Sequence, residues 1–377
     1  MMIEIRGTGT YNKGAELMAH AILEHFWQKD DSNSTKFVVI RRFGTYQERT
    51  NLGMYTKLPT SRFERSKFIK FLISSSRPVH GFVREEEIDI IIDASGFAYS
   101  DQWGPGPVER LVKQMQARQR IGSSKLILLP QAFGPFTSDR TQSAFKEIQE
   151  SADLIFAREE ESYNYIKSLD GCLNNLRIAP DFTNMVQGIV PQTWKSNSSC
   201  VLIIPNTRML DKTDPQNSQN YLKFLCNCIK ETIKRGLQPT LLLHSPEDNC
   251  FVQLLREQPA NLQVVYESNP LNIKGIIVTA YFVIGSRFHA LVNAFSQGVP
   301  AIGTGWSHKY TYLFQEYGCP HLLLPVQASP ATISNTFDIL TEGQSRLKLV
   351  EQIFTNGKEL KNAVHAMWRE VDSVIYS

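Results

Sequence analysis

Cysteine is scarce in this chain, and its placement is typical of neither a zinc site nor a disulfide framework. The chain has 377 residues and 6 cysteines, which are scattered and form no Cys-x-x-Cys pair or zinc-type Cys/His spacing. We therefore expect reduced thiols, as in a cytosolic protein, and we expect no metal and no cofactor. A loosely held divalent ion beside a phosphate stays an alternative.

Long apolar runs and a strong net charge are also missing. No apolar run approaches the ~20 residues needed to span a bilayer, and no signal peptide is expected before the strand-like residues 3–6. The net charge of +3 is too small to indicate nucleic-acid binding. With 42% hydrophobic and 20% charged residues, the composition is that of a soluble globular protein, which we expect in the cytoplasm.

Two common phosphate-binding motifs are absent near the N-terminus. Residues 7–16 form a glycine-rich loop before a helical pattern, and such a loop can bring backbone amides close to a ligand. After Gly9 the next glycine, Gly14, is too far on for the dinucleotide fingerprint, and no Gly-Lys-Ser/Thr of a Walker loop occurs. The loop is either a ligand-binding turn of another kind or a tight turn packed with small residues.

What the sequence does contain is a repeated alternation of apolar runs and helical patterns. Such alternation predicts an α/β fold with parallel sheets and helices on both faces. The expected strands cover residues 3–5, 37–40, 88–92, 125–129, 153–157, 201–204, 239–243, 262–265, 281–284 and 301–303.

Length and composition predict two domains. A chain of 377 residues exceeds the usual size of one domain, and residues 192–199 are polar and serine-rich. We predict an N-terminal α/β domain over residues 1–191, a C-terminal α/β domain over residues 200–345, and a helical tail over residues 346–377 that packs across both. Ligands of such sheets gather at the carboxyl ends of strands, so we expect a cleft there.

The most informative stretch is residues 283–291. An apolar run ends at Gly285, Ser286 stands where a helix N-cap is expected, and the helix then begins with Arg287 and His289. Cations at the positive end of a helix dipole cost a few tenths of a kcal/mol or more, which an anion at the helix start would offset. The turn therefore indicates an anion site, unless both side chains are solvated surface residues.

Residues 41–84 carry many basic side chains interleaved with apolar ones. This segment is either a basic amphipathic surface for an acidic acceptor or for anionic lipid at the membrane periphery, or a solvated helix and loop packed on the domain. Its basic residues are Arg41, Arg42, Arg49, Lys57, Arg62, Arg65, Lys67, Lys70, Arg77 and Arg84.

Six short motifs occur in a fixed order along most of the chain. They occupy residues 12–16, 129–135, 157–162, 180–181, 284–290 and 298–300, and Lys309 follows the last. In this order and spacing they resemble the polysaccharide pyruvyl transferase family. The resemblance implies two Rossmann-like domains in a glycosyltransferase-B-like arrangement facing a cleft. It also implies transfer of a pyruvyl group from phosphoenolpyruvate to sugar hydroxyls, which forms a ketal.

The resemblance also implies the residues of the donor site. In the family an Arg-x-His at the start of the late helix serves phosphoenolpyruvate, which carries over to Arg287 and His289. A further arginine of the second domain is best matched by Arg208. Phosphoenolpyruvate carries a phosphate and a carboxylate close together, and forked guanidinium groups suit both. Ser286 and Lys309 complete the expected donor site, with Lys309 stabilising the departing phosphate.

Proton transfer near neutral pH requires a titratable group, and histidine suits that task. We assign the role to His289, with His244 in reserve. The acceptor sugar is expected against the N-terminal domain, near Asn12, Glu16, Ser95 and Gln131. The sequence leaves open whether the acceptor is a free glycan, a nucleotide sugar or a lipid-linked intermediate.

Two other functions are compatible with the same sequence. A glycosyltransferase using a nucleotide sugar should carry a ribose-binding carboxylate late in the second domain, but residues 286–309 contain neither Asp nor Glu. A non-catalytic module that binds sugar phosphate should lack the acid–base residue, whereas His289 is present. Both observations favour the pyruvyl transferase.

Overall fold

The structure of the chain is a computed structural model that describes residues 1–29, 34–58, 81–119, 124–211, 213–255, 262–305 and 307–377. The described chain divides into two compact units. Unit 1 comprises Met1–Phe182 and Ala363–Ser377, and unit 2 comprises Thr183–Asn362. Each unit contains one parallel sheet with helices, so the predicted α/β fold is confirmed.

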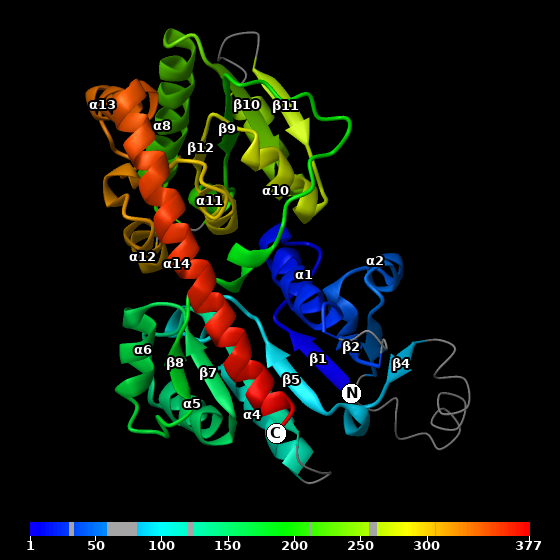
Figure 1. Ribbon diagram of the computed structural model, residues 1–377. Helices are drawn as coiled ribbons and strands as arrows, with labels where there is room; N and C mark the ends of the chain where they lie inside the picture. Colours follow the sequence, from blue (N-terminus) through cyan, green and yellow to red (C-terminus); the bar gives the residue numbers. More distant parts are fainter. Residues whose placement is uncertain (30–33, 59–80, 120–123, 212, 256–261, 306) are drawn as a thin grey trace. The chain divides into compact units, whose positions relative to one another are not determined.

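Unit 1 is built on an 8-stranded sheet with the order β4-β3-β2-β1-β5-β6-β7-β8 (Figure 1). Because β1 pairs with both β2 and β5, the order of the strands reverses between β1 and β5. Ligands of open parallel sheets bind outside such a switch point. The strands are β1 (Met2–Arg6), β2 (Lys36–Val39), β3 (Tyr55–Lys57), β4 (Phe82–Val83), β5 (Ile90–Asp93), β6 (Lys125–Gln131), β7 (Leu154–Ala157) and β8 (Leu176–Ile178).

The helices of unit 1 follow the strand ends, and two of them, α4 and α5, pack against each other. Helix α1 contacts the last turns of α14 through Phe26 and Trp368, whose rings lie edge to face at 6.3 Å. The helices are α1 (Lys13–Trp27), α2 (Tyr46–Asn51), α4 (Gly106–Gln119), α5 (Asp139–Ser151), α6 (Glu160–Lys167) and the end of α14 (Gly343–Ile375).

Unit 2 is built on a 5-stranded sheet with the order β11-β10-β9-β12-β13. All its pairs are parallel, and the switch point lies between β9 and β12. The strands are β9 (Cys200–Ile204), β10 (Gln238–Leu243), β11 (Gln263–Tyr266), β12 (Phe282–Gly285) and β13 (Ala301–Gly303).

In unit 2, helix α8 packs against α13, and α10 packs against α11. The helices are α7 (Arg208–Asp211), α8 (Pro215–Lys234), α9 (Cys250–Leu254), α10 (Pro270–Val278), α11 (Phe288–Phe295), α12 (His308–Glu316), α13 (Pro330–Thr341) and the first part of α14. No helix in the described parts of the chain combines the length and the apolar character needed to cross a membrane.

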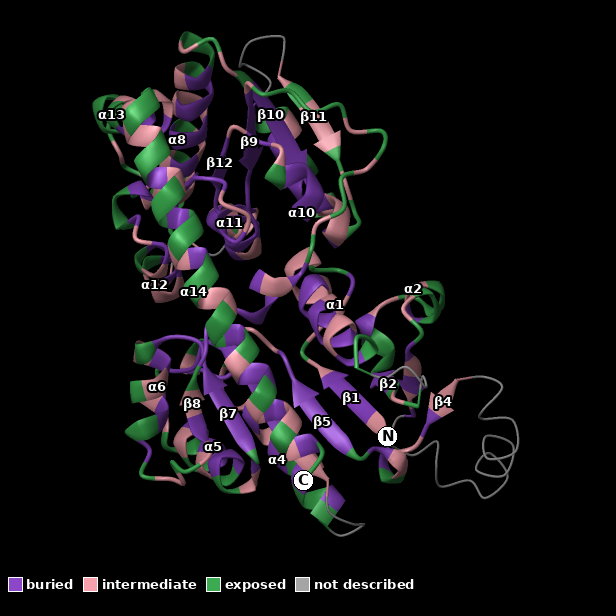
Figure 2. Ribbon diagram, in the orientation of Figure 1, coloured by how far each residue is buried: buried purple, intermediate pink, exposed green. Residues whose placement is uncertain are grey.

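The central strands form because their sequences are continuous apolar runs. Strands β9 and β12 are buried along their whole length, as Figure 2 shows by their colour. A parallel strand covered by helices on both faces has no solvent side, so apolar residues occupy both faces rather than alternating.

The units divide at Phe182, before the polar stretch 192–199 in which the sequence analysis placed the boundary. The intervening segment packs on α10 of unit 2. The Ile189 amide donates to the Leu271 carbonyl at 2.9 Å, and the buried Lys274 ammonium donates to the Thr183 carbonyl at 2.8 Å. The polar stretch 192–199 is mostly exposed. Residues 183–191 belong to unit 2 because they make these contacts with α10.

The tail expected over residues 346–377 is part of a helix that begins at Gly343. In unit 2, Arg346 donates to the Tyr281 carbonyl at 2.7 Å. In unit 1, the Trp368 ring stacks on His25 at 3.9 Å. Each part of α14 therefore contributes to the core of the unit in which it lies.

Part of the basic segment 41–84 serves the interior of unit 1. Arg49 is buried and donates to the Thr56 hydroxyl at 2.9 Å. Lys57 pairs with Glu4 at 2.8 Å and with Glu85 at 2.6 Å. These two cations are therefore not part of a solvated basic surface. Five other basic residues of the segment lie outside the described residues: Arg62, Arg65, Lys67, Lys70 and Arg77.

Candidate functional site

The turn between β12 and α11 lies at the switch point of the unit 2 sheet. The N-cap of α11 is Arg287, so the prediction that Ser286 is the N-cap is wrong. The reason is that Ser286 continues the strand pairing, with its amide donating to the Ile204 carbonyl at 3.2 Å. Its hydroxyl lies 2.5 Å from the hydroxyl of the buried Tyr221, and no side-chain hydrogen bond from the described residues caps α11.

Arg287 is held in one orientation by two partners. Its Nε donates to the Pro205 carbonyl at 3.0 Å, and its Nη2 lies 2.5 Å from both carboxylate oxygens of Asp248. Among the residues that the structure describes, Nη1 has no hydrogen-bond partner. A guanidinium has five N–H donors, so the two on Nη1 remain for a ligand.

Asp248 is the buried counter-charge of this arginine. Its side chain is 1% exposed, while that of Arg287 is 19% exposed. Burial raises the pKa of the Asp248 carboxyl, and the Arg287 charge offsets part of that rise. The ion pair with Asp248 thus fixes the Nη2 side of the Arg287 guanidinium, while the side chain stays partly exposed to solvent.

Arg208 begins α7 directly after β9 and is more loosely held. It pairs with Asp211 at 2.6 Å and approaches Glu247 at 3.8 Å. All three side chains are more than two-fifths exposed, so these ion pairs are screened and contribute little. Arg208 can therefore exchange its carboxylate partners for a ligand.

The other predicted donor-site residues also follow strand ends in unit 2. His244 is buried and comes directly after β10. His289 lies in the first turn of α11, and its ring meets Phe288 edge to face at 5.5 Å. The Lys309 ammonium lies 5.2 Å from the centre of the same Phe288 ring. Both His289 and Lys309 therefore contact the Phe288 ring.

These contacts form two groups of side chains at the carboxyl edge of the sheet. In the first group Arg287 pairs with Asp248, and the next residue, Glu247, lies near Arg208. In the second group His289 and Lys309 each contact the Phe288 ring. In the described parts of the chain, no cluster of three or more His, Cys, Asp or Glu side chains is placed to hold a metal ion. The described residues present a fixed arginine at the start of α11 and a histidine in the first turn of the same helix.

The residues expected to bind the acceptor lie in unit 1, and two of them act within α1. Asn12 is the N-cap of α1 and accepts from the Gly14 amide at 3.0 Å. Glu16 pairs with Lys13 at 2.7 Å, and burial raises the pKa of the Glu16 carboxyl. Both side chains stabilise the start of the helix.

The other two, Ser95 and Gln131, lie near the switch point of the unit 1 sheet. Gln131 is fully buried at the end of β6, and its amide nitrogen lies 3.3 Å from Asp93 Oδ1. Its carbonyl oxygen has no hydrogen-bond partner among the described residues. Ser95 follows β5 and lines a cavity of about 680 Å³.

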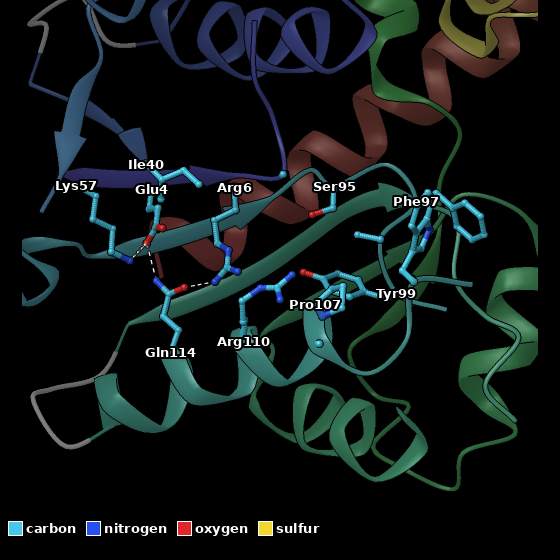
Figure 3. Close-up of a pocket in the computed structure, with 14 residues that line it drawn as sticks. Glu4, Arg6, Ile40, Lys57, Ser95, Phe97, Tyr99, Pro107, Arg110 and Gln114 are labelled. Atoms are coloured by element: carbon cyan, nitrogen blue, oxygen red, sulfur yellow. Dashed lines mark hydrogen bonds and ion pairs between the residues drawn. The ribbon is translucent and has the colours of Figure 1, made fainter. Parts of the chain in front are cut away.

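Several residues that line this cavity were not predicted from the sequence as site residues. Figure 3 shows Arg6 extending from β1 and Arg110 from α4 toward the space between them. Phe97, Tyr99 and Trp103 contribute aromatic rings. The one signal in the sequence was the pair Glu4 and Arg6, two charged residues in a short strand that is otherwise apolar.

A family model described as polysaccharide pyruvyl transferase matches residues 12–308. The chain belongs to this family. The match runs from the N-cap of α1 to the first residue of α12. It includes the switch point of unit 2, whereas β1 of unit 1 lies before it. The description of the family names a transferase that acts on polysaccharides.

A curated relative agrees with this membership. The amylovoran biosynthesis protein AmsJ of Erwinia amylovora is 18% identical to this pyruvyl transferase family member over 265 residues, which are 64% of this chain. The match spans 63% of the relative's own length.

Solved structures agree with the fold. MnaA of S. aureus, solved with UDP, has a TM-score of 0.60 at 11% identity and covers 100% of this chain and 96% of its own. Anabaena HepE, solved with UDP and glucose, has a TM-score of 0.59 at 10% identity and covers 100% of this chain and 99% of its own. The predicted glycosyltransferase-B type of fold is therefore confirmed for this pyruvyl transferase family member.

Proposed function

We propose that this protein transfers the pyruvyl group of phosphoenolpyruvate to two hydroxyls of a sugar in a polysaccharide or its precursor, forming a pyruvate ketal. The observation that carries the proposal is the fixed guanidinium of Arg287 at the switch point of unit 2. The edge of the guanidinium that the described residues leave unpaired suits an oxyanion, and the family membership supports a transfer reaction on a polysaccharide.

Donor binding would use two arginines of different character. Arg287 offers an oriented pair of N–H groups from Nη1, while Arg208 is exposed and can close on the ligand. Phosphoenolpyruvate carries a phosphate and a carboxylate, and charge-assisted hydrogen bonds to such groups are worth about 1.5–3 kcal/mol each. Ser286 contributes through its position beside Arg287 rather than as a helix cap.

The proposed reaction balances with phosphate as the second product. One sugar hydroxyl adds to the carbon that bears the phosphate, and a proton reaches the methylene carbon, which becomes a methyl group. The carbon–oxygen bond to phosphate then breaks. The second hydroxyl adds to the same carbon, and its proton leaves with the phosphate.

A histidine would move these protons. His289 is the first candidate because it lies in the turn after Arg287, and His244 is the second because it directly follows β10 of the same sheet. Lys309, beside Phe288, would stabilise the departing phosphate. The acceptor would bind to unit 1, which contains the residues predicted for it from the sequence: Asn12, Glu16, Ser95 and Gln131.

The test is calorimetric binding of phosphoenolpyruvate to the full chain and to Arg287→Lys. We expect the variant to lose most of the affinity, because Lys cannot keep the contacts to Asp248 and Pro205 while presenting a fork. Arg235→Lys is the matched control, since Arg235 is an ion-paired arginine at the other end of the unit 2 strands. Equal affinity in wild type and Arg287→Lys would remove Arg287 from the site.

The same experiment separates the competing functions. UDP-sugars are measured alongside, because MnaA and HepE were solved with UDP. Binding of a UDP-sugar without binding of phosphoenolpyruvate would move the assignment to glycosyl transfer. Binding of phosphoenolpyruvate without phosphate release, with every acceptor tried, would support a non-catalytic binding protein.

The reaction would take place in the cytoplasm, and the protein would contact a membrane if the acceptor is lipid-linked. The basic composition of residues 41–84 supports such a membrane contact. Charge reversal at Arg62, Arg65 and Lys67 should then release the protein from anionic vesicles. Unchanged vesicle binding would contradict membrane contact through this segment.

A further inference from the structure

The cavity of unit 1 is the second place where the topology predicts a ligand. Arg6 ends β1, Ser95 follows β5, and these two strands are the neighbours at the switch point. Pro107, Arg110 and Gln114 of α4 form its opposite wall (Figure 3). Its volume of about 680 Å³ lies in the range of small-molecule sites.

The carboxylates around this cavity are already neutralised by the protein. Glu4, which is 1% exposed, pairs with Lys57 at 2.8 Å and accepts from Gln114 at 2.7 Å. Gln114 in turn accepts from Arg6. Asp93 is fully buried, lies 3.7 Å from Arg6 and accepts from the Tyr99 hydroxyl at 2.7 Å. These acidic groups therefore have no charge left over for a ligand cation.

Arg110 lines the same cavity and is not part of this network of ion pairs and hydrogen bonds. Its side chain is exposed on α4, and among the described residues it has no ion pair with a carboxylate. It lies one helical turn before Gln114, on the same face of α4, so it reaches the space above the network. The wall of the cavity is consequently positive and suits a ligand that carries an anionic group.

An exposed aromatic platform lies at the same cavity. Trp103 is 46% exposed, and its ring meets Phe97 edge to face at 6.4 Å. The exposed ring is accessible to a ligand, and the C–H face of a sugar ring can pack against it. An aromatic ring next to a guanidinium is thus an arrangement for an acidic sugar.

The loop that carries Trp103 is held in place by the rest of unit 1. The Asp101 amide donates to the Pro135 carbonyl at 3.0 Å, and the Asp101 carboxylate accepts from the Thr137 hydroxyl at 2.7 Å. The Gly134 amide donates to the Tyr99 carbonyl at 2.9 Å. Because the loop is anchored directly before Trp103, the platform is pre-formed and needs little ordering when a ligand binds.

We propose that this cavity binds the acceptor and that the acceptor is an acidic saccharide, a sugar bearing a carboxylate or a phosphate. Arg110 pairs with the anionic group, Trp103 covers the face of the sugar ring, and Arg6 and Gln114 contact hydroxyls. The inference rests on the proposed function, in which a sugar accepts the pyruvyl group. It replaces part of the acceptor set predicted from the sequence, since only Ser95 of that set lines the cavity.

The test measures saccharide binding to the full chain by calorimetry. The probes are a disaccharide of glucuronic acid and glucose, the neutral disaccharide with glucose in both positions, and glucose 1-phosphate. We expect the acidic disaccharide to bind about tenfold more tightly than the neutral one, the size of one charge-assisted hydrogen bond. Comparison with glucose 1-phosphate tells whether a carboxylate or a phosphate is preferred.

Two variants locate the binding. Arg110→Gln should abolish the preference for the acidic disaccharide, and Trp103→Ala should weaken both disaccharides about equally. Arg177→Gln, at an exposed ion-paired arginine of β8, is the control and should change neither. Equal binding of the acidic and neutral disaccharides to the wild type would overturn the acidic class, and unchanged binding in both variants would overturn the site.

Phosphoenolpyruvate binding, measured on the same samples, separates this inference from the proposed function. Both variants should bind phosphoenolpyruvate like the wild type, because Arg110 and Trp103 lie in the other unit from Arg287. If the wild type binds the acidic disaccharide but not phosphoenolpyruvate, the donor assignment fails while the saccharide site stands. If Arg110→Gln loses phosphoenolpyruvate, the cavity holds the donor, and the acceptor inference is overturned.

Discussion

At the scale of single residues, the candidate donor site depends on how one arginine is held. Nε and Nη2 of Arg287 are committed to Pro205 and Asp248, which turns a flexible side chain into an oriented pair of donors. Arg208 is exposed and keeps its freedom. A fixed guanidinium loses little entropy on binding, while a mobile one can adjust to the ligand.

The buried counter-charge of Arg287 should show itself in the pH dependence of stability. Burial raises the pKa of the Asp248 carboxyl in the folded protein above the value of ~3.9 that is usual in unfolded chains. The folded protein therefore keeps the Asp248 proton to a higher pH than the unfolded chain does. The stability from this group is full below that pH and is lost as the pH rises through the folded pKa. The free energy of unfolding of the wild type relative to Asp248→Asn should therefore fall as the pH rises. Urea denaturation between about pH 3 and 6 measures it, and a rising difference would contradict the prediction.

Asp372 should behave in the opposite way. Burial would raise its pKa, but hydrogen bonds from His25 and Lys29 outweigh burial and lower it. Its contribution is therefore present above ~3.9 and is lost as the pH falls through the folded pKa. The free energy of unfolding of the wild type relative to Asp372→Asn should shrink as the pH is lowered from about 5 to 2. A difference that stays constant over this range would show that the contacts of Asp372 do not depend on its charge.

At the scale of elements, the sequence predicted the central strands and missed three short ones in the described parts of the chain, β3, β4 and β8. Strands such as β9 and β12 are unbroken apolar runs, which covering helices on both faces produce. Strands β3 and β8 have three residues each and include Lys57 or Arg177, so they show neither an apolar run nor a clear alternation. Their pairing partners, rather than their own residues, make them strands.

The two candidate sites could be predicted from the sequence to different degrees. The Arg-x-His turn is local, because Arg287 and His289 lie within one turn of each other. The cavity of unit 1 is not local, since Lys57, Gln114 and Asp93 meet Glu4 and Arg6 across distant parts of the chain. The Ser286 cap failed for the same reason, because Tyr221 on another helix takes its hydroxyl.

The contact between α10 and residues 183–191 depends on Gly275. A Cβ at Gly275 would lie 2.1 Å from the Ile189 carbonyl oxygen, which is backbone and cannot turn away. Gly275→Ala should therefore lower the free energy of unfolding by about 1–3 kcal/mol, although alanine favours helix. Gly343→Ala in α14 is the control, because nothing lies within 4 Å of its added Cβ. Equal stability of the Gly275→Ala variant and the wild type in urea would show that the segment moves aside freely.

At the scale of the whole molecule, the same device occurs twice. Each unit has a parallel sheet whose strand order reverses once, and each reversal gathers arginines: Arg287 beside β9 and β12, and Arg6 beside β1 and β5. The net charge of the chain is only +3, so binding of anions would come from these local arrangements rather than from the overall field. One chain would thus recognise two anionic ligands separately.

This division predicts that each ligand protects one unit. Hydrogen exchange of the full chain with phosphoenolpyruvate should slow at the turn from β12 into α11, residues 285–290, because amides at a helix start are donors for an anion. Unit 1 should exchange as in the free protein, since its core and its cavity belong to that unit alone.

With the acidic disaccharide, protection should instead appear around residues 95–110. Arg287→Lys should lose the first effect and keep the second. Protection by phosphoenolpyruvate at residues 95–110 would mean that the donor occupies the cavity of unit 1, and the two arginine sites would have to exchange roles.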